Sequence, residues 1–383
     1  MYIISPYLRF TQTPSGYMMI FNFLLDKLQD LSTEMLPILK FCVKERTEHD
    51  ILAQFGNKQL LDRMIANYQI VSSETIWREN FCNILEIETS TLCSWKCEYC
   101  PVRSHARPVK FIDPVLFSLI LNRAEDYGGF KQISLTSYNE ASLDDNFIWY
   151  IQEIRKHGFD LLLYSNGSYL TQDKLNAVQA MKEHAKICFN LPSLNRARFE
   201  YMTGSKTYDS SIAAIDAAID KGIRVTIIVQ GDNETRELEQ NRIQRRFPKA
   251  YVATYASNNR GAAVFNSYIE KIKIPNQRLT GCYMVTRHVC LTVDGDMMLC
   301  CNDFYHANLF GNIKEASFKS LLTSEKAVAA RKATWGGCQP GEGHLCRVCT
   351  LMQESMTQDR FVAIDKIKIT DITKNMRNKV RSI

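Results

Sequence analysis

From about residue 83 the sequence alternates short apolar runs with amphipathic segments, and this alternation limits the chain to few folds. Strands are predicted at 84–89, 132–137, 160–165, 186–191, 224–230 and 251–255, with helices near 114–126, 143–157, 171–182, 209–221 and 233–246. Six βα-type units in sequence imply a parallel sheet, and right-handed crossovers would curl it into a barrel or partial barrel. We therefore predict an α/β fold whose chemistry gathers at the carboxyl ends of the strands.

The segment before this alternation, residues 1–82, is predicted to form a small helical module. Ser32 or Thr33 can cap a first helix, Thr47 and Asp50 resemble a capping box before a second, and a third amphipathic run covers 60–65. A strand is predicted at 68–71. Three short helices followed by a strand are typical of a winged-helix module, and an ordinary helical lid fits the same pattern.

The barrel is predicted to span 83–275. After it, cysteines, glycines and polar residues become frequent, which predicts a small metal-stapled domain over 276–355. The basic tail, 356–383, is predicted to be a solvated face or a frayed end.

Thirteen cysteines in 383 residues are the compositional anomaly of a chain that is otherwise ordinary for a globular protein. The longest apolar stretch, 17–25, is far shorter than the ~20 residues of a membrane span, and its flanks do not form a signal peptide. We therefore expect a cytoplasmic protein whose clustered cysteines bind metal rather than form disulfides. The formal charge of +6 is mild, so neither nucleic acid nor a membrane is expected as a partner. Three cysteines in apolar surroundings, Cys42, Cys82 and Cys188, are predicted to be small core residues.

The first cysteine group, Cys93, Cys97 and Cys100, follows the first predicted strand with the spacing Cys-x3-Cys-x2-Cys. Three thiolates on one loop can hold three irons of a four-iron cubane and leave the fourth iron open to a chelating ligand. A structural zinc site is the competing interpretation, because His105 could supply a fourth ligand.

This loop, with the aromatic Tyr99 before its last cysteine, resembles the signature of the radical S-adenosylmethionine (radical SAM) superfamily, and the resemblance extends over about 83–355. Four later positions match further motifs of that family: Glu140 after the second strand, Asn166 with Gly167 after the third, Asn190 at the end of the fourth, and Asn259-Arg260-Gly261 near the sixth. The two glycines and the proline that flank the family's glutamate are missing here.

The resemblance implies a (β/α)6 partial TIM barrel that binds a [4Fe–4S] cluster and SAM. Cys93, Cys97 and Cys100 would be the iron ligands, and Tyr99, Glu140, Asn166 and Asn190 would contact SAM. It also implies a 5′-deoxyadenosyl radical that abstracts hydrogen from the substrate, and a flavodoxin- or ferredoxin-type reductant.

The second cysteine group lies after residue 276. Asp294-Gly295 between apolar runs predicts a hairpin turn. Four cysteines, in the order Cys-x12-Gly-x4-Cys, a gap and Cys-x2-Cys, are similar to the twitch and SPASM extensions of the family: Cys282, Cys300, Cys346 and Cys349. The resemblance implies one auxiliary [4Fe–4S] cluster on these ligands. A second auxiliary cluster on Cys290, Cys301 and Cys338, or a zinc knuckle, remains an alternative.

Two substrate classes fit this pattern. The module at 1–82 looks like the winged-helix elements that bind the leader of a precursor peptide, which favours modification of a ribosomally synthesised peptide by crosslinking, thioether formation, rearrangement or epimerisation. Epimerisation would need a hydrogen donor, for which Cys338 and Cys301 are candidates. A small-molecule dehydrogenase or epimerase acting on aminocyclitols or sugars is the alternative. A simple iron–sulfur electron carrier would not need Glu140 beside an open-iron loop.

Overall fold

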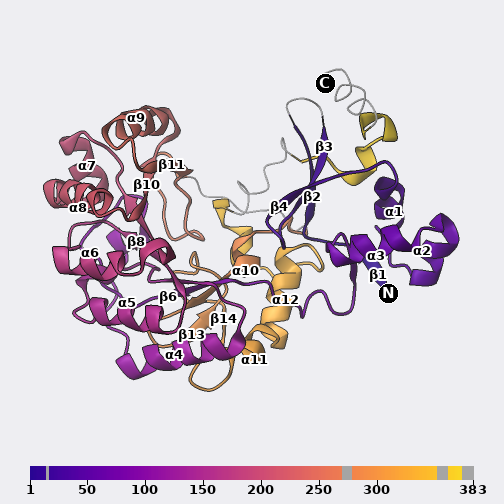
Figure 1. Ribbon diagram of the computed structural model, residues 1–383, viewed down its shortest axis with the longest axis horizontal. Coiled ribbons are helices and arrows are strands. Elements are labelled where there is room, and N and C mark those ends of the chain that lie inside the picture. Colours follow the sequence, from indigo (N-terminus) through magenta and orange to yellow (C-terminus); the bar gives the residue numbers. More distant parts are fainter. Residues whose placement is uncertain (14–16, 270–277, 352–360, 373–383) are drawn as a thin grey trace.

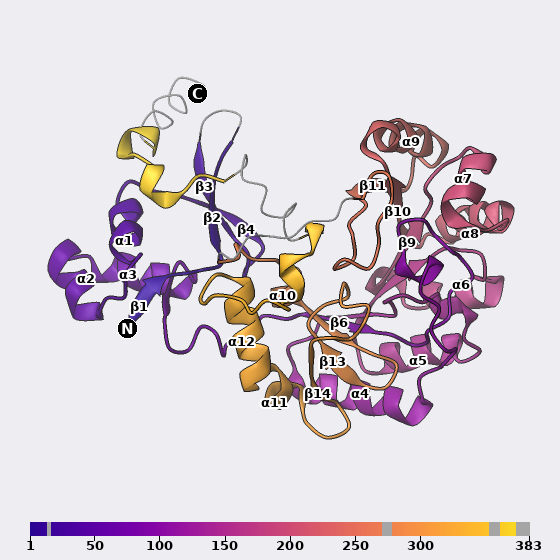
Figure 2. The ribbon, with the colours of Figure 1, turned by 180° about the vertical axis from the view of Figure 1, so that it is seen from behind.

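The computed structural model describes residues 1–13, 17–269, 278–351 and 361–372. A parallel sheet with covering helices forms one side of the molecule, and an N-terminal module forms the other (Figure 1). The orange cysteine-rich region lies between them in both views (Figure 2). The structure is mixed α/β, as predicted.

The parallel sheet contains all six predicted strands, which are β6 (Ile84–Ile87), β7 (Gln132–Ser134), β8 (Asp160–Ser165), β9 (Ala185–Asn190), β10 (Arg224–Gly231) and β11 (Tyr251–Ala256). The strand order is β11-β10-β9-β8-β7-β6-β12-β13-β14, where the last three are His288–Leu291, Asp296–Met298 and Leu309–Asn312. Since β11 and β14 are the two ends of this order, the described strands form an open sheet, which confirms the partial barrel.

The helices that cover the sheet are α4 (Pro114–Tyr127), α5 (Phe147–Lys156), α6 (Gln172–Gln179), α7 (Arg196–Thr203), α8 (Tyr208–Asp220) and α9 (Asn233–Arg246). Helix α7 was not predicted. It buries only Phe199, Met202 and Thr203 and therefore has almost no apolar periodicity in its sequence.

Side chains alternate along each strand between the helix-covered face and the inner face of the sheet. On β6, Leu85 and Ile87 belong to the main apolar core, whereas Glu86 lies on the opposite face. On β9, Cys188 packs with Leu162 of β8 in a separate small cluster on the inner face. The inner face is thus partly polar, unlike the core on the other side.

The N-terminal module contains the three predicted helices, α1 (Met35–Phe41), α2 (Glu48–Phe55) and α3 (Lys58–Ala66), followed by β5 (Ile70–Ser72). The predicted capping box of α2 is present, with Thr47 and Asp50 each accepting the other's backbone N–H at 3.0 Å. The prediction of a helical module was incomplete, because four strands precede the helices: β1 (Tyr2–Ile4), β2 (Leu8–Gln12), β3 (Met18–Asn22) and β4 (Lys27–Asp30).

Strands β2, β3 and β4 form an antiparallel sheet, and β1 pairs with β5. The apolar run at 17–25 contains β3, whose alternate residues are buried. A continuous apolar run conceals the period of two that identifies a strand, which is why the sequence did not reveal this sheet.

The cysteine-rich region contains α10 (Met284–Arg287), β12 (His288–Leu291), β13 (Asp296–Met298), β14 (Leu309–Asn312), α11 (Phe318–Leu322) and α12 (Glu325–Thr334). The predicted turn joins β12 to β13, with Gly295 at φ 88°. Strand β12 pairs in parallel with β6, so this region continues the barrel sheet. The domain limits 1–82, 83–275 and 276–355 remain predictions.

The described part of the C-terminal tail packs on the N-terminal module. Val362 donates its N–H to Phe10 O of β2 over 2.7 Å, and the buried side chains of Ile367 and Ile372 join the module's core. For these residues the prediction of a solvated or frayed tail is wrong. The other predicted tail residues, 356–360 and 373–383, lie outside the described residues.

Among the described residues, no helix combines the length and the apolarity that crossing a bilayer requires.

Candidate metal and cofactor site

The first cysteine group lies on the loop that follows β6, at the carboxyl edge of the parallel sheet. Two backbone hydrogen bonds fix the loop: Lys96 N–H donates to Thr203 O over 2.8 Å, and Glu140 N–H donates to Leu92 O over 2.8 Å. Gly204, with φ 60°, approaches the loop so closely that a Cβ would stand 3.1 Å from the Lys96 oxygen. Helix α7, which was not predicted, therefore ends on a glycine for two reasons. The left-handed cap favours glycine, and the close contact with Lys96 leaves little room for a Cβ.

The three cysteines of this loop lie close together and are half-buried as residues. Burial, together with the neighbouring thiols of Cys100 and Cys93, raises the pKa of Cys97 well above its usual value. Burial and the nearby Glu140 carboxylate raise the pKa of Cys93 to about 12. Sulfurs that oppose each other's ionisation become thiolates when a positively charged iron centre binds them. The donor set therefore fits a cysteine-ligated cluster.

The zinc alternative would use His105 as its fourth ligand. His105 is exposed, and its Nε2 lies 3.1 Å from the hydroxyl of Tyr305.

Glu140 is buried beside the loop and connects it to the next strand end. Its Oε1 accepts hydrogen bonds from the hydroxyls of Ser142 at 2.6 Å and Ser165 at 2.8 Å, and its Oε2 accepts the Asn166 N–H at 2.6 Å. Burial raises the pKa of Glu140 despite these hydrogen bonds. The carboxylate therefore fixes the turn after β8 next to the cysteine loop.

Asn166 completes this connection. Its side-chain amide donates to the hydroxyl of Ser94, between the first two cysteines, over 3.2 Å. The structure thus brings together Glu140, Asn166 and the cysteine loop, three features that sequence reasoning selected separately.

The two other predicted SAM contacts lie farther from this network. Tyr99 is buried against Met202 and Val264, and burial and the neighbouring Cys97 raise its pKa well above the usual value. Asn190 lies at the end of β9, where its side-chain oxygen accepts a hydrogen bond from Gln230 at 3.4 Å. Both sit on or beside the carboxyl edge of the sheet.

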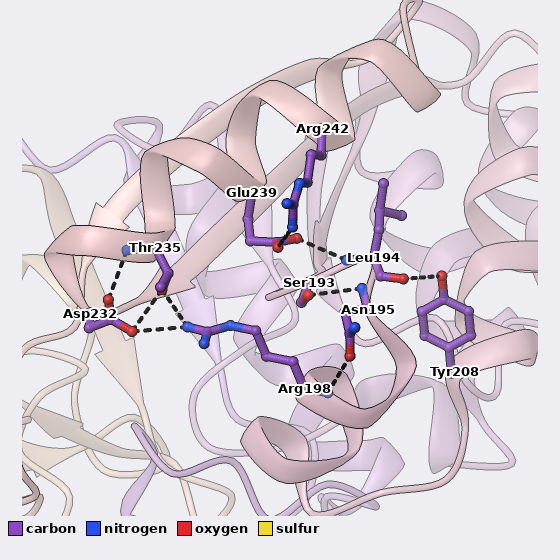
Figure 3. Close-up of polar contacts among 9 residues, drawn as sticks. All are labelled: Ser193, Leu194, Asn195, Arg198, Tyr208, Asp232, Thr235, Glu239 and Arg242. Atoms are coloured by element: carbon purple, nitrogen blue, oxygen red, sulfur yellow. Dashed lines mark hydrogen bonds and ion pairs between the residues drawn. The ribbon is translucent and has the colours of Figure 1, made fainter.

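A second polar network stands at the same edge, between the ends of β9 and β10 (Figure 3). Arg198 of α7 pairs with Asp232, which also caps α9 by accepting the Thr235 N–H at 2.8 Å. Buried Glu239 accepts the Leu194 N–H at 3.1 Å. Sequence reasoning did not identify Arg198 because it belongs to the helix that was missed.

The second cysteine group is more deeply buried. Cys282, Cys300, Cys346 and Cys349 are each at most 7% exposed. Burial raises the pKa of Cys300 well above its usual value, and the charges of the three other cysteines and of Cys301 raise it further. The four predicted auxiliary ligands therefore lie together, as a thiolate-ligated cluster requires.

Aromatic side chains of the N-terminal module cover this group. Trp335 lies with its ring centroid 4.8 Å from that of Tyr7 and 5.3 Å from that of Phe23. Tyr7, Phe23 and the four cysteines belong to one apolar cluster. The N-terminal module thus forms part of the wall of the second cysteine site.

Sequence reasoning also missed a buried polar cluster on the inner face of the sheet. Glu86 of β6 lies 2.7 Å from Nδ1 of His288 and accepts a hydrogen bond from the thiol of Cys290 at 3.2 Å, both on β12. A hydrogen bond with Cys301, together with burial, raises the pKa of Cys290 well above its usual value. Of the three unassigned cysteines, Cys290 and Cys301 are neighbours. Cys338 is partly exposed and takes no part in the contacts of this cluster among the described residues.

The turn at 259–261 lies between the two cysteine groups. Its Arg260 has φ 48°. Burial lowers the pKa of Arg260, but the neighbouring Tyr138, Cys100 and Cys301 outweigh it and raise the pKa above the usual value. Asn259 donates to Val348 O over 2.6 Å, next to Cys349. The predicted turn therefore bridges the barrel and the cysteine-rich region.

Comparison with known proteins gives two matches to family models. Residues 87–241 match the radical SAM superfamily, and residues 282–350 match an iron–sulfur cluster-binding domain, SPASM.

Two curated proteins are similar in sequence. The S-adenosyl-L-methionine-dependent 2-deoxy-scyllo-inosamine dehydrogenase of Niallia circulans is 20% identical over 270 residues, which cover 70% of this chain and 92% of that protein. The tungsten-containing aldehyde ferredoxin oxidoreductase cofactor-modifying protein of Pyrococcus furiosus is 30% identical over 91 residues. That match spans 24% of this chain and 26% of the relative.

Among the solved structures that share the fold are two that are each 12% identical in sequence. Streptococcus suis SuiB bound to precursor peptide SuiA has a TM-score of 0.58 and covers 96% of this chain and 100% of that chain. The structure of anSMEcpe with bound AdoMet has a TM-score of 0.52, and the match covers 77% of this chain and 91% of that chain.

Proposed function

Because this chain belongs to the radical SAM superfamily, we propose that it modifies a ribosomally synthesised peptide, with iron and SAM held at Cys93, Cys97 and Cys100. The observation that carries the proposal is the three-thiol loop beside the buried Glu140–Asn166 network, in a chain whose N-terminal sheet ends, among the described strands, at β4.

The first site combines thiols with a rigid polar wall. When bound, the [4Fe–4S] cluster and SAM supply an organic radical that abstracts hydrogen. The three thiols would hold three irons and leave one open. Glu140 would bind the amino group of SAM, and Asn166, Asn190 and Tyr99 would supply the remaining contacts. Glu140 also fixes the position of Asn166, so the SAM contacts form one preorganised unit.

The second site would bind one auxiliary [4Fe–4S] cluster through Cys282, Cys300, Cys346 and Cys349. Four thiols for one cluster leave no open iron. The inner face between the two sites carries Glu86, which contacts His288 and Cys290. These polar side chains would help to hold a substrate.

A peptide substrate is supported by the sheet of the N-terminal module. Edge strands present unpaired backbone groups to which another strand can add. The edge at β2 is already contacted by Val362, whereas β4 pairs only with β3 among the described strands. We infer that a leader segment adds at β4. The fold likeness to SuiB, whose structure contains its precursor peptide, extends over this module.

The test begins with anaerobically reconstituted protein, SAM and dithionite. About eight irons per chain, with formation of 5′-deoxyadenosine, are expected for one cluster at each site. The protein is then co-expressed with short peptides encoded beside its gene, which are analysed by mass spectrometry. A mass change that requires Cys97 supports the proposal. Stoichiometric zinc without 5′-deoxyadenosine would refute it.

A small-molecule dehydrogenase remains the second candidate, favoured by the similarity to the Niallia circulans enzyme over 70% of the chain. Experiments on the edge of β4 distinguish the two candidate functions. Under the peptide proposal, the substrate peptide slows hydrogen exchange of the amides at 27–30, and Leu28→Pro impairs modification more than Leu28→Ala. Neither variant should affect 5′-deoxyadenosine formation. If Leu28→Pro turns over normally, the small-molecule candidate is favoured.

A further inference from the structure

The turn after β11 has a strained backbone. Three residues in succession are left-handed: Arg260 at φ 48°, Gly261 at φ 62° and Ala262 at φ 71°. Glycine adopts this region freely, whereas the other two positions cost free energy that surrounding contacts have to offset. Backbone strain of this kind concentrates at binding and catalytic sites. In this turn it fixes the point from which the Arg260 side chain extends.

Contacts with the cysteine-rich region hold the turn in this conformation. Asn259 donates its backbone N–H to the hydroxyl of Thr350 over 2.9 Å, and Thr350 donates its N–H to the side-chain oxygen of Asn259 over 3.1 Å. A Cβ on Gly261 would stand 2.8 Å from the backbone oxygen of Asn302. The turn is therefore packed tightly against this region, and the position of Arg260 is well defined.

The guanidinium of Arg260 has no acidic partner among the described residues. Its Nη1 makes one long contact, 3.5 Å to the side-chain oxygen of Asn302, and its Nε is buried without an acceptor. Arg107 differs, because it pairs with the buried carboxylate of Glu88 at 2.6 Å. A guanidinium has five N–H donors and no acceptor, and its charge is costly to bury unless an anion pairs with it. Arg260 therefore has donors left for a ligand.

Tyr138 supplies a second unused donor beside Arg260. The residue is 7% exposed, its hydroxyl has no hydrogen-bond partner, and its ring packs edge to face on Phe304 with 4.9 Å between centroids. Burial raises the pKa of Tyr138 well above its usual value, and the nearby positive charge of Arg260 opposes this rise. Tyr138 also lies in the segment before Glu140 that lacks the two glycines of the family motif.

These two donors lie between the two cysteine groups. The small apolar cluster that contains Tyr138 packs against Cys93 and Cys100 of the first group. On the other side, Asn302, which contacts Arg260, donates to the sulfur of Cys349 over 3.6 Å. Arg260 and Cys100 are only half-buried, so solvent reaches part of this region.

We propose that Arg260 and Tyr138 form a subsite that binds a carboxylate of the substrate between the two cysteine groups. This inference rests on the proposed function, because the carboxylate belongs to the substrate peptide, either as an acidic side chain or as its C-terminus. One carboxylate oxygen accepts from the guanidinium and the other from the phenol, and the anion neutralises the arginine charge. The subsite orients the peptide, and no bond forms or breaks there.

The experiment is titration calorimetry on anaerobically reconstituted protein with SAM present, so that SAM occupies its own site. Acetyl-glutamate methylamide probes a side-chain carboxylate, and acetyl-alanine probes a C-terminal one. Acetyl-glutamine methylamide is the uncharged match. The variants are Arg260→Gln and Tyr138→Phe, and the control is Arg103→Gln, which removes an exposed charge from the first cysteine loop. The affinity for SAM is measured for each protein.

The wild type should bind one of the two carboxylate probes about tenfold or more tightly than the glutamine probe, because the hydrogen bonds are charge-assisted. The probe that is preferred identifies the source of the carboxylate. Arg260→Gln should remove this preference, and Tyr138→Phe should weaken the preferred probe by about fivefold, the usual effect of one lost hydrogen bond. Arg103→Gln should behave as the wild type, and the affinity for SAM should be unchanged in all three variants.

Three outcomes would overturn the inference. The first is a wild type that binds no carboxylate probe better than the glutamine probe, a result that does not depend on the folding of any variant. The second is equal weakening by Arg260→Gln and Arg103→Gln. The third is a loss of SAM affinity in Arg260→Gln, which would assign the arginine to SAM. A wild type that binds iron and forms 5′-deoxyadenosine without a carboxylate preference rejects only this subsite, whereas failure of both reactions rejects the proposed function.

Discussion

The two cysteine groups differ most in what surrounds them. The first lies on a loop of half-buried cysteines, between the polar side chains of Glu140 and Asn166 and small apolar clusters that include Tyr99 and Tyr138. The second is more deeply buried, and Trp335 in the same apolar cluster meets Tyr7 of the N-terminal module edge to face. Both groups are sets of cysteines in one chain, but their environments favour opposite uses.

The difference follows from whether a further ligand must reach the metal at each site. A site that binds a polar cofactor needs an open ligand position and polar walls, and its burial is therefore incomplete. A site with four thiols needs no further ligand and is stabilised by apolar covering. Because the N-terminal module supplies part of that covering, the integrity of the second site depends on a segment more than 200 residues away in sequence.

The largest expected effect separates the chemistry of the two groups. Cys97→Ala should abolish 5′-deoxyadenosine formation, because two thiols cannot hold the cluster in place. Cys346→Ala should retain this reaction and lose the modified product. Liquid chromatography of both products measures the contrast. If Cys97→Ala still cleaves SAM, the assignment of the first group is wrong.

The next effect tests the aromatic covering. Trp335→Ala should lower the free energy of unfolding by roughly 3–5 kcal/mol, the usual cost of removing a buried large aromatic side chain. It should also release the second group's iron to a chelator before the first group's. Trp149→Ala, on the barrel helix α5, is the control and should not change the order of release. Calorimetry and timed iron release provide the two measurements.

The open site was easier to predict from the sequence than the covered one. The strands could be located because their apolar runs alternate with helices, and the loop of Cys93, Cys97 and Cys100 is a local pattern. Glu140 was identified through the family resemblance, which places a glutamate after the second strand. These features depend on short-range sequence order, which a single sequence contains.

Features created by distant contacts could not be predicted. Glu86 and His288 are 202 positions apart and meet only because β12 joins the sheet beside β6. Nothing in the sequence around Trp335 indicates that its ring contacts Tyr7 and Phe23. Helix α7 has too few buried residues for a periodic signal, although its glycine end fixes the cysteine loop.

A smaller effect is expected from the polar wall of the first site. Glu140→Gln removes the charge and one acceptor while keeping the size, so the dissociation constant of SAM should rise by about tenfold or more, since a hydrogen bond to a charged group contributes roughly 1.5–3 kcal/mol. Asp144→Asn is the control, because this nearby buried carboxylate binds the hydroxyl of Tyr150 instead. Equal affinity in Glu140→Gln and wild type would exclude Glu140 from the SAM site.

The smallest effect concerns the outer edge of the open site. Burial favours a higher pKa for Asp232, but hydrogen bonds from Thr235 and Arg198 outweigh it and hold the pKa at about 2. Because this folded-state pKa lies below the ordinary value, the stabilisation is present at neutral pH and is lost as pH falls from about 4 through 2. Asp232→Asn keeps a side chain that can cap α9 but loses the charged pair with Arg198, so it should lower stability at pH 7 by roughly 0.2–1 kcal/mol, and by progressively less as the pH falls below 4.

Urea unfolding at pH 7 and at several values below 4 measures this dependence. The control is Asp216→Asn, which breaks the exposed pair with Arg246 and should have almost no effect, as surface ion pairs contribute little. Since Asp232 lies at the carboxyl edge of the sheet and pairs with Arg198 in the first turn of α7, its loss should also loosen the start of α7 without changing iron release from the second group. If Asp232→Asn releases iron equally from both groups, the edge of the open site is not independent of the covered site, and the contrast between the two groups fails.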